Sequence, residues 1–195
     1  MAWTTEESFA RRTWETTPLS LSLDKDRIAV GLNDGSVEIW STDTDSDGIS
    51  KAISKPSCHT KGVKAVLWYN GLLITGSYDS LICLWSVTEK LDLLQTVQLH
   101  SDGVWDLQSD KTGICPWILS AGLDGGIGLM RMNFNEMGLE VVTKWNIENE
   151  EFTCVQLSSP LGMVACGKSM KIVAETLVPG EISIDTNYLA FDRRG

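Results

Sequence analysis

The segment from Gly162 to Ser169 reads GMVACGKS and satisfies the phosphate-loop pattern. In such a loop, backbone N–H groups surround the phosphates, a lysine (here Lys168) neutralises them and a hydroxyl (here Ser169) holds magnesium. The loop must follow a strand and open a helix, whereas residues 163–166 align with a strand of the repeat described below. The residues after Ser169 are also too few for the rest of an α/β nucleotide domain. A nucleotide-binding enzyme is therefore the less favoured interpretation.

The acidic segment DTDSDG, Asp43 to Gly48, begins like a calcium-binding loop, with oxygen ligands at alternate positions and a glycine for the sharp turn. Calcium takes about six to eight oxygen ligands, and a bidentate glutamate belongs at the twelfth position. That position is Ser54 here, and the ninth position is the cation Lys51. We expect an acidic, solvated loop between two strands, with calcium binding as the alternative.

The chain has two histidines, and each begins the same five-residue pattern, HTKGV from His59 and HSDGV from His100. A catalytic histidine needs a nucleophile beside it, and a metal-binding one needs cysteines or histidines at ligand spacing. Neither accompanies these residues in the sequence. Because both histidines recur with the repeat, we expect them to be buried and hydrogen-bonded, and we predict no metal site and no catalytic residue.

Three aspartates mark an internal repeat. Asp34, Asp79 and Asp124 are 45 residues apart, and each lies six residues before a large side chain. Those side chains are Trp40, Trp85 and Met130. In each unit an apolar run leads into the aspartate turn and a second one follows, which is the pattern of a β-hairpin. The period matches the roughly 40–45 residues of one four-stranded propeller blade.

A fourth unit and part of a fifth are more degenerate. Residues 152–157, 163–167 and 171–177 read as three strands, although the turn aspartate and the tryptophan are missing. Residues 182–191 align with residues 21–30 position for position. They are therefore predicted to open a fifth unit.

The repeats resemble the WD-repeat family. A histidine that begins the blade, a hydroxyl four residues before the turn aspartate and a tryptophan six residues after it match the buried tetrad of that family. The second unit has all four residues, His59, Thr75, Asp79 and Trp85. The third has His100, Ser120 and Asp124 with Met130 for tryptophan, and the first has Asp34 and Trp40 with Val30 and no histidine. A carboxylate and a hydroxyl can satisfy both nitrogens of a buried imidazole.

We therefore predict an all-β chain, a β-propeller of four-stranded antiparallel blades. About four and a half blades are expected, at about 17–57, 58–99, 100–150, 151–179 and, in part, 180–195. By resemblance the complete ring would have seven blades, so this one is incomplete. The alternative is a closed four-bladed ring with residues 180–195 as a tail. Residues 1–16 are expected to be an extension or a strand that closes the ring.

Composition agrees with one globular domain. The 195 residues are 43% hydrophobic and include eight tryptophans, which argues against disorder. A net charge of −10 disfavours a nonspecific grip on nucleic acid, which depends on clusters of lysine and arginine. No apolar run approaches the length of a membrane span, and no secretory signal is evident. The five cysteines read as reduced residues of a cytoplasmic or nuclear protein.

The resemblance also implies a binding face. In the family, the top of the propeller is lined by the residue before each turn aspartate and by a residue early in each inner strand. These positions hold Asn33, Tyr78 and Leu123, and Leu19, Lys64, Trp105 and Thr153. Tyrosine, tryptophan and a cation on one rim have the composition of a protein-binding hot spot. The alternative is that Trp105 and Leu123 fill the central channel or a blade junction.

These observations favour a noncatalytic scaffold or adaptor that binds other proteins through the top face, without a cofactor. Nucleic acid, membranes and small-molecule substrates are not expected partners. Within the same class, the alternative is the substrate-recognition subunit of a ubiquitin ligase. From another class, the alternative is the nucleotide-binding enzyme that Lys168 would serve.

Overall fold

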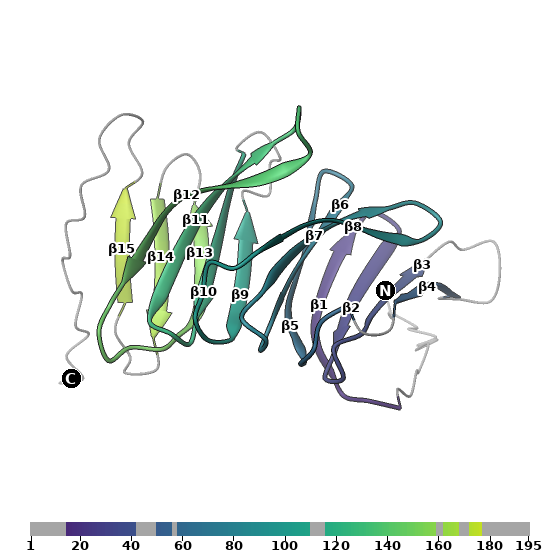
Figure 1. Ribbon diagram of the computed structural model, residues 1–195, viewed down its shortest axis with the longest axis horizontal. Coiled ribbons are helices and arrows are strands. Elements are labelled where there is room, and N and C mark those ends of the chain that lie inside the picture. The colour runs from purple at the N-terminus through teal and green to yellow at the C-terminus, as the bar shows by residue number, and fades with distance from the viewer. Residues whose placement is uncertain are drawn as a thin grey trace, which may run out of the picture.

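A computed structural model describes residues 15–41, 50–55, 58–109, 116–158, 162–167 and 172–176. Within these ranges the chain forms strands and turns without a helix, in four antiparallel sheets that we call the first to fourth blades (Figure 1). The described part of the chain therefore contains no helix that is long and apolar enough to cross a membrane. The fifth blade expected at 180–195 lies outside the described residues, as do residues 1–14 of the extension expected at 1–16. The division into blades beyond these sheets stays a prediction.

Each blade runs back and forth in chain order. The first blade consists of β1 (Pro18–Asp24), β2 (Arg27–Leu32), β3 (Val37–Ser41) and β4 (Ser50–Lys55). The second consists of β5 (Val63–Tyr69), β6 (Leu72–Ser77), β7 (Ile82–Val87) and β8 (Leu91–Val97). The third consists of β9 (Val104–Ser109), β10 (Trp117–Gly122), β11 (Gly126–Asn133) and β12 (Gly138–Asn146). The fourth has β13 (Phe152–Ser158), β14 (Gly162–Gly167) and β15 (Ile172–Thr176).

The turn after each repeated aspartate has the same backbone conformation. Gly35, Ser80 and Gly125 directly follow the three aspartates and have φ values of 85°, 70° and 74°. Glycine adopts this left-handed conformation without steric cost, and a serine tolerates it less well. At Gly35 a side chain would also collide with the carbonyl oxygen of His59. The repeat therefore extends from sequence to backbone geometry.

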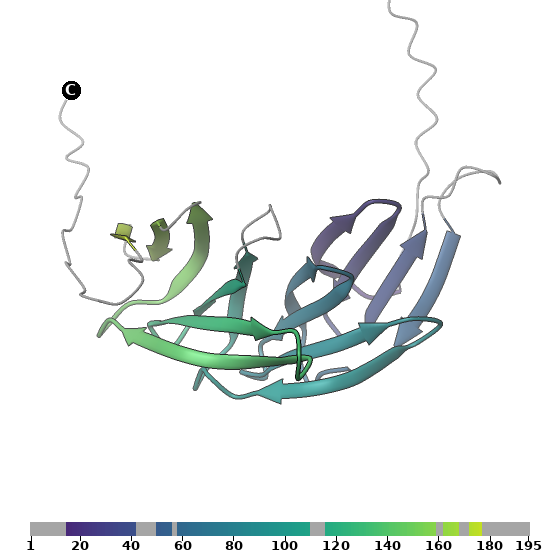
Figure 2. The same ribbon diagram turned by 90° about the horizontal axis from the view of Figure 1, so that it is seen from above.

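Seen from above, the blades follow one another along an arc, with the first blade (purple to blue) at one end and the fourth blade (yellow-green) at the other (Figure 2). The inner strands β1, β5, β9 and β13 contact their neighbours in that order. The described blades therefore form an open, partial propeller, in agreement with the predicted fold class, and not the closed four-bladed ring. The total of seven blades stays a prediction.

The hydrophobic core lies between the blades. One apolar cluster joins the first blade to the second, another the second to the third, and another the third to the fourth. The central strand β6 is buried at all six positions because both of its faces are covered. Full burial of one large apolar side chain stabilises a fold by about 1.5–3 kcal/mol. Junctions between blades, and not the sheets alone, therefore supply most of the hydrophobic stabilisation.

Candidate functional site

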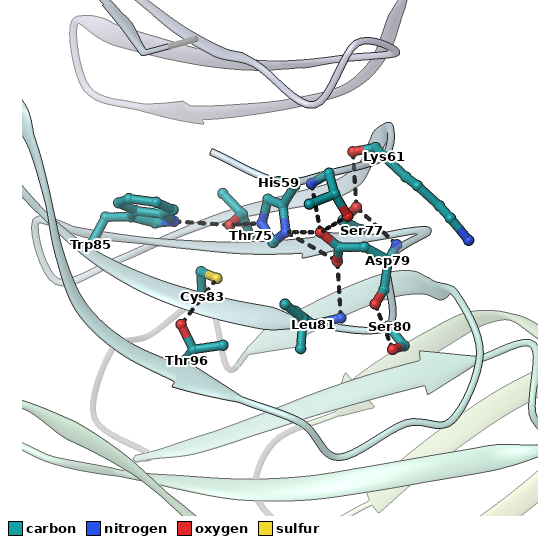
Figure 3. A network of polar contacts seen from close by, with 11 residues as sticks. His59, Lys61, Thr75, Ser77, Asp79, Ser80, Leu81, Cys83, Trp85 and Thr96 are labelled. Atoms are coloured by element: carbon teal, nitrogen blue, oxygen red, sulfur yellow. Dashed lines mark hydrogen bonds and ion pairs between the residues drawn. The ribbon is translucent and has the colours of Figure 1, made fainter. Parts of the chain in front are cut away.

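The four predicted tetrad residues of the second blade meet in one buried network (Figure 3). Nδ1 of His59 lies 3.0 Å from a carboxylate oxygen of Asp79, and Nε2 lies 2.7 Å from Oγ1 of Thr75. Nε1 of Trp85 donates to the same hydroxyl at 2.9 Å. Asp79 also accepts the backbone N–H groups of Thr60 and Leu81. The network thus ties the loop before β5 to the β6–β7 turn.

The proton positions follow from the donors. The indole N–H of Trp85 donates to Thr75, so the threonine hydroxyl is free to donate to Nε2 of His59, and Nδ1–H donates to Asp79. This order requires a neutral imidazole, and burial indeed lowers the pKa of His59, against the opposing charge of Asp79. Burial alone would raise the pKa of Asp79, but its hydrogen bonds from Thr60, His59 and Leu81 lower it overall. The carboxylate stays ionised.

The third blade repeats the network with one change. His100 lies 2.9 Å from Asp124 and 2.8 Å from the Ser120 hydroxyl, while Met130 fills the tryptophan position without a donor. Nζ of Lys144, on β12, lies 2.7 Å from the other oxygen of Asp124. A side chain at Gly126 would collide with Lys144, whereas the second blade has Leu81 there. Glycine therefore makes room for a cation that the second blade lacks.

The first and fourth blades have only parts of the network. Asp34 accepts the backbone N–H and the hydroxyl of Ser36, and the indole of Trp40 donates to Glu38. In the fourth blade, Gly167 has the position of Gly122 in the third. A side chain on Gly122 would strike His100, and one on Gly167 would strike Glu150. Glu150, which is buried, thus takes the place of the missing histidine.

The arrangement of these groups suits a structural role. The side chains of His59 and His100 are 0% exposed and those of their aspartates 5%, so a substrate in solvent cannot reach the imidazoles. Both ring nitrogens of each histidine already have partners. Among the residues that the structure describes, there is also no group of three side chains suited to hold a metal ion.

A second cluster consists of four of the predicted binding residues and lies at the end of the blades that carries the aspartate turns. The rings of Tyr78 and Trp105 meet edge to face, with centroids 5.4 Å apart. Nζ of Lys64 lies 5.0 Å from the Trp105 centroid, within the range of a cation–π contact. Tyr78 and Leu123 both lie against Gly103. We call Lys64, Tyr78, Trp105 and Leu123 the top rim; all four are half-buried.

The structure does not bring every predicted binding residue into this group. Asn33 is exposed and lies with Leu19 against Gly62, at the junction of the first and second blades. Thr153 lies on β13 of the fourth blade. Backbone hydrogen bonds show the equivalence of the positions, because Asn33, Tyr78 and Leu123 each donate an N–H to the loop before an inner strand. The rim thus gathers residues of the second and third blades.

The ligand-binding patterns of the sequence have different outcomes. Met163 to Cys166 lie in β14, which pairs with β13 and β15, so this part of the phosphate-loop pattern is a strand of a sheet. Lys168 and Ser169 lie outside the described residues, as does the acidic segment from Asp43 to Gly48.

Sequence reasoning missed Lys144 and Glu150. Two positions of the third blade signal that its network has a different partner for the aspartate. The third blade has Gly126 where the second has leucine, and Met130 where the second has tryptophan. In the fourth blade no such signal exists, since Glu150 lies two positions from the residue that aligns with the histidines.

Comparisons with known proteins bear on the fold. The family "WD domain, G-beta repeat" matches residues 50–86, and the comparison with curated protein sequences gave no match. The crystal structure of RRP9 WD40 repeats is 18% identical with a TM-score of 0.71 over 84% of this chain. The structure of U3-55K is 18% identical with a TM-score of 0.72 over 85%. The computationally designed Ika4 protein is 17% identical with a TM-score of 0.70 over 85%.

The chain spans about half the length of two of these structures, 49% of the RRP9 chain and 50% of U3-55K, and 94% of Ika4. At these identities the likeness concerns the fold. The matched repeat includes His59, Thr75, Asp79 and Trp85, the complete hydrogen-bonded network of the second blade. Together with the consecutive antiparallel blades, these comparisons show that the chain has the fold of a partial β-propeller, one repeat of which, at residues 50–86, matches the WD domain.

Proposed function

We propose that this chain is a noncatalytic module that binds a protein partner at its top rim. The WD-repeat propeller is, in general, a scaffold for protein interaction and is typically without catalytic activity. The contact of Trp105 with Tyr78 and Lys64 is the observation that carries the finer proposal. Tryptophan and tyrosine are enriched among the residues that dominate the binding energy of protein interfaces, because rigid rings bring large contact area at low entropic cost.

The geometry of the rim supports binding in two further ways. Its rings are held by contacts with each other and with the backbone at Gly103, so a partner would meet a preorganised surface and pay little to order it. The rim also bridges two blades, and a partner seated there would contact the second and third blades at once. We place the protein in the cytoplasm or nucleus, where its cysteines stay reduced.

The proposal is tested by affinity capture with the full chain as bait and quantitative mass spectrometry of its partners. Trp105→Ala and Lys64→Glu should each lose the partners of the wild type while thermal unfolding stays unchanged. Phe134→Ala is the matched control, because Phe134 is a 47% exposed aromatic residue at the β11–β12 turn, away from the rim. Equal capture by the rim variants and the wild type would refute the proposal.

Thermal melts of the same protein test the alternative function, a nucleotide-binding enzyme. A rise in melting temperature with nucleotide and magnesium that is abolished by Lys168→Ala would support an enzyme in place of the scaffold. Substrate recognition within a ubiquitin ligase is a narrower form of the proposed function and stays a prediction of the sequence.

A further inference from the structure

We propose that the top rim binds a short acidic segment of a partner protein, with carboxylates over the second blade and an apolar side chain against Trp105 and Leu123. This inference rests on the proposed function, and it names the chemistry of the partner. Two observations support it. The free polar groups of the rim are hydrogen-bond donors, and the unpaired positive charge at this end of the described blades lies on the second blade.

Each residue of the rim with a polar side chain offers a hydrogen-bond donor. Nζ of Lys64 lies 5.0 Å from the centroid of Trp105 and forms no ion pair within the described part of the chain. The indole N–H of Trp105 and the hydroxyl of Tyr78 have no hydrogen-bond partner among the described residues. Partial burial raises the pKa of Tyr78, so the hydroxyl keeps its proton at neutral pH. A carboxylate accepts hydrogen bonds and donates none, so it complements this set of donors.

Charge is distributed unevenly over the loops that lead into the inner strands. The loop before β5 carries Lys61, whose exposed side chain extends away from the buried network (Figure 3). Lys64 follows near the start of β5. The equivalent of Lys61 in the third blade is Asp102, and the fourth blade has three glutamates between residues 148 and 151. Because Lys61 also has no ion pair among the described residues, the second blade is where an acidic segment would bind.

Carboxylates fit these groups better than phosphates do. Phosphorylated segments are bound mainly by clusters of arginine, whose planar guanidinium group contacts two oxygens at once. The top rim has one lysine and no arginine. A lysine nitrogen is a compact cation, and together with neutral donors it matches the single charge of a carboxylate.

Nucleic acid also fits less well. It is held through many phosphate contacts, which the net charge of −10 and the acidic residues in the loops of the third and fourth blades oppose. The nitrogen of Lys64 lies over the ring of Trp105, where a base would stack. A short acidic segment meets less opposition, because at about 0.15 M ionic strength charges beyond about 8 Å are largely screened. Its carboxylates then interact mainly with Lys61 and Lys64.

Selection of binders from a random peptide library, with the full chain as bait, tests the inference. Peptides that bind the wild type and not Trp105→Ala are the ligands of the rim. They should be rich in aspartate and glutamate and should contain an apolar residue. Rim ligands that are neutral or basic would overturn the inference and leave the proposed function standing. A complete absence of peptides that depend on Trp105 would overturn both.

Fluorescence anisotropy with one labelled rim ligand measures the contribution of the lysine. Lys64→Glu should weaken binding about tenfold or more, whereas Lys64→Arg, which keeps the cation, should bind nearly as tightly as the wild type. The matched control is Lys25→Glu, which makes the same change in net charge at an exposed lysine of the β1–β2 turn, at the opposite end of the blades. Its affinity should equal that of the wild type. Equal midpoints in thermal melts show that the variants fold.

Three results of these measurements would overturn the proposal. The first is equal affinity of Lys64→Glu and the wild type. The second is binding about tenfold tighter when phosphoserine replaces glutamate in the peptide, which would assign the rim to a phosphorylated segment. The third is a labelled single-stranded RNA that binds the wild type and not Trp105→Ala, which would assign the rim to nucleic acid.

Discussion

Replacement of Asp79 by alanine should destabilise the protein far more than the same change at Asp34. Asp79 accepts hydrogen bonds from the His59 ring and from the backbone of Thr60 and Leu81, and its side chain is only 5% exposed. Its loss leaves a buried ring N–H and two backbone donors without an acceptor. Removal of one partner from a buried charged network costs about 3–5 kcal/mol. Asp34 is exposed and, within the described part of the chain, accepts hydrogen bonds from Ser36, so its loss should cost about 0.5–1.5 kcal/mol.

Urea unfolding followed by tryptophan fluorescence measures the difference. With a slope of about 2–3 kcal/mol per molar urea, a gap of 3 kcal/mol separates the two midpoints by about 1–1.5 M. Asp79→Asn is the matched control, because its amide oxygen still accepts a hydrogen bond, and it should fall between alanine and wild type. Equal midpoints for Asp79→Ala and Asp34→Ala would refute the role of the network.

Three further predictions concern the same networks. Burial lowers the pKa of His59 and His100, so the unfolded chain binds protons before the folded chain does as the pH falls below about 6.5. The free energy of unfolding should therefore drop by up to about 1.4 kcal/mol per histidine at pH 5.5. An unchanged urea midpoint between pH 7.5 and 5.5 would contradict this. Lys144→Met should lower the free energy of unfolding by about 1–2 kcal/mol, because it removes the cation beside Asp124. Lys90→Met, which breaks the exposed pair with Asp92, should lower it by about 0–0.5 kcal/mol in the same thermal melts. Equal losses would argue against the Lys144 contact. Trp85→Phe keeps the ring but removes the donor to Thr75 and should cost about 1 kcal/mol or more in the same melts, and a neutral result would remove tryptophan from the network.

The elements with local sequence signals could be predicted. Strands expected at 152–157 and 163–167 correspond to β13 and β14, although the fourth unit lacks the turn aspartate. Local periodicity and turn chemistry indicated these strands. The network of the second blade was expected from the resemblance to the WD-repeat family, whose tetrad His59, Thr75, Asp79 and Trp85 match in type and spacing.

Contacts between segments could not be predicted in the same way. Lys144 reaches Asp124 from β12, two strands beyond the β10–β11 turn, and its partner depends on how the sheet twists. The approach of Trp105 to Tyr78 depends on the angle between two blades, which no single repeat encodes. The exposed state of Leu21 and Leu23 likewise depends on what lies beside the first blade, since their apolar character is the same as that of the buried Val66 and Leu107.

Nuclear Overhauser spectroscopy of the labelled protein tests most directly that successive segments form the same antiparallel blade. The register predicts that Thr75 lies opposite Val66 and Cys83, and that Ser120 lies opposite Leu107 and Gly128. Cross-strand signals between these pairs should therefore appear in both blades. Helical contacts between residues 63 and 133, or a different pairing in the two segments, would contradict the account.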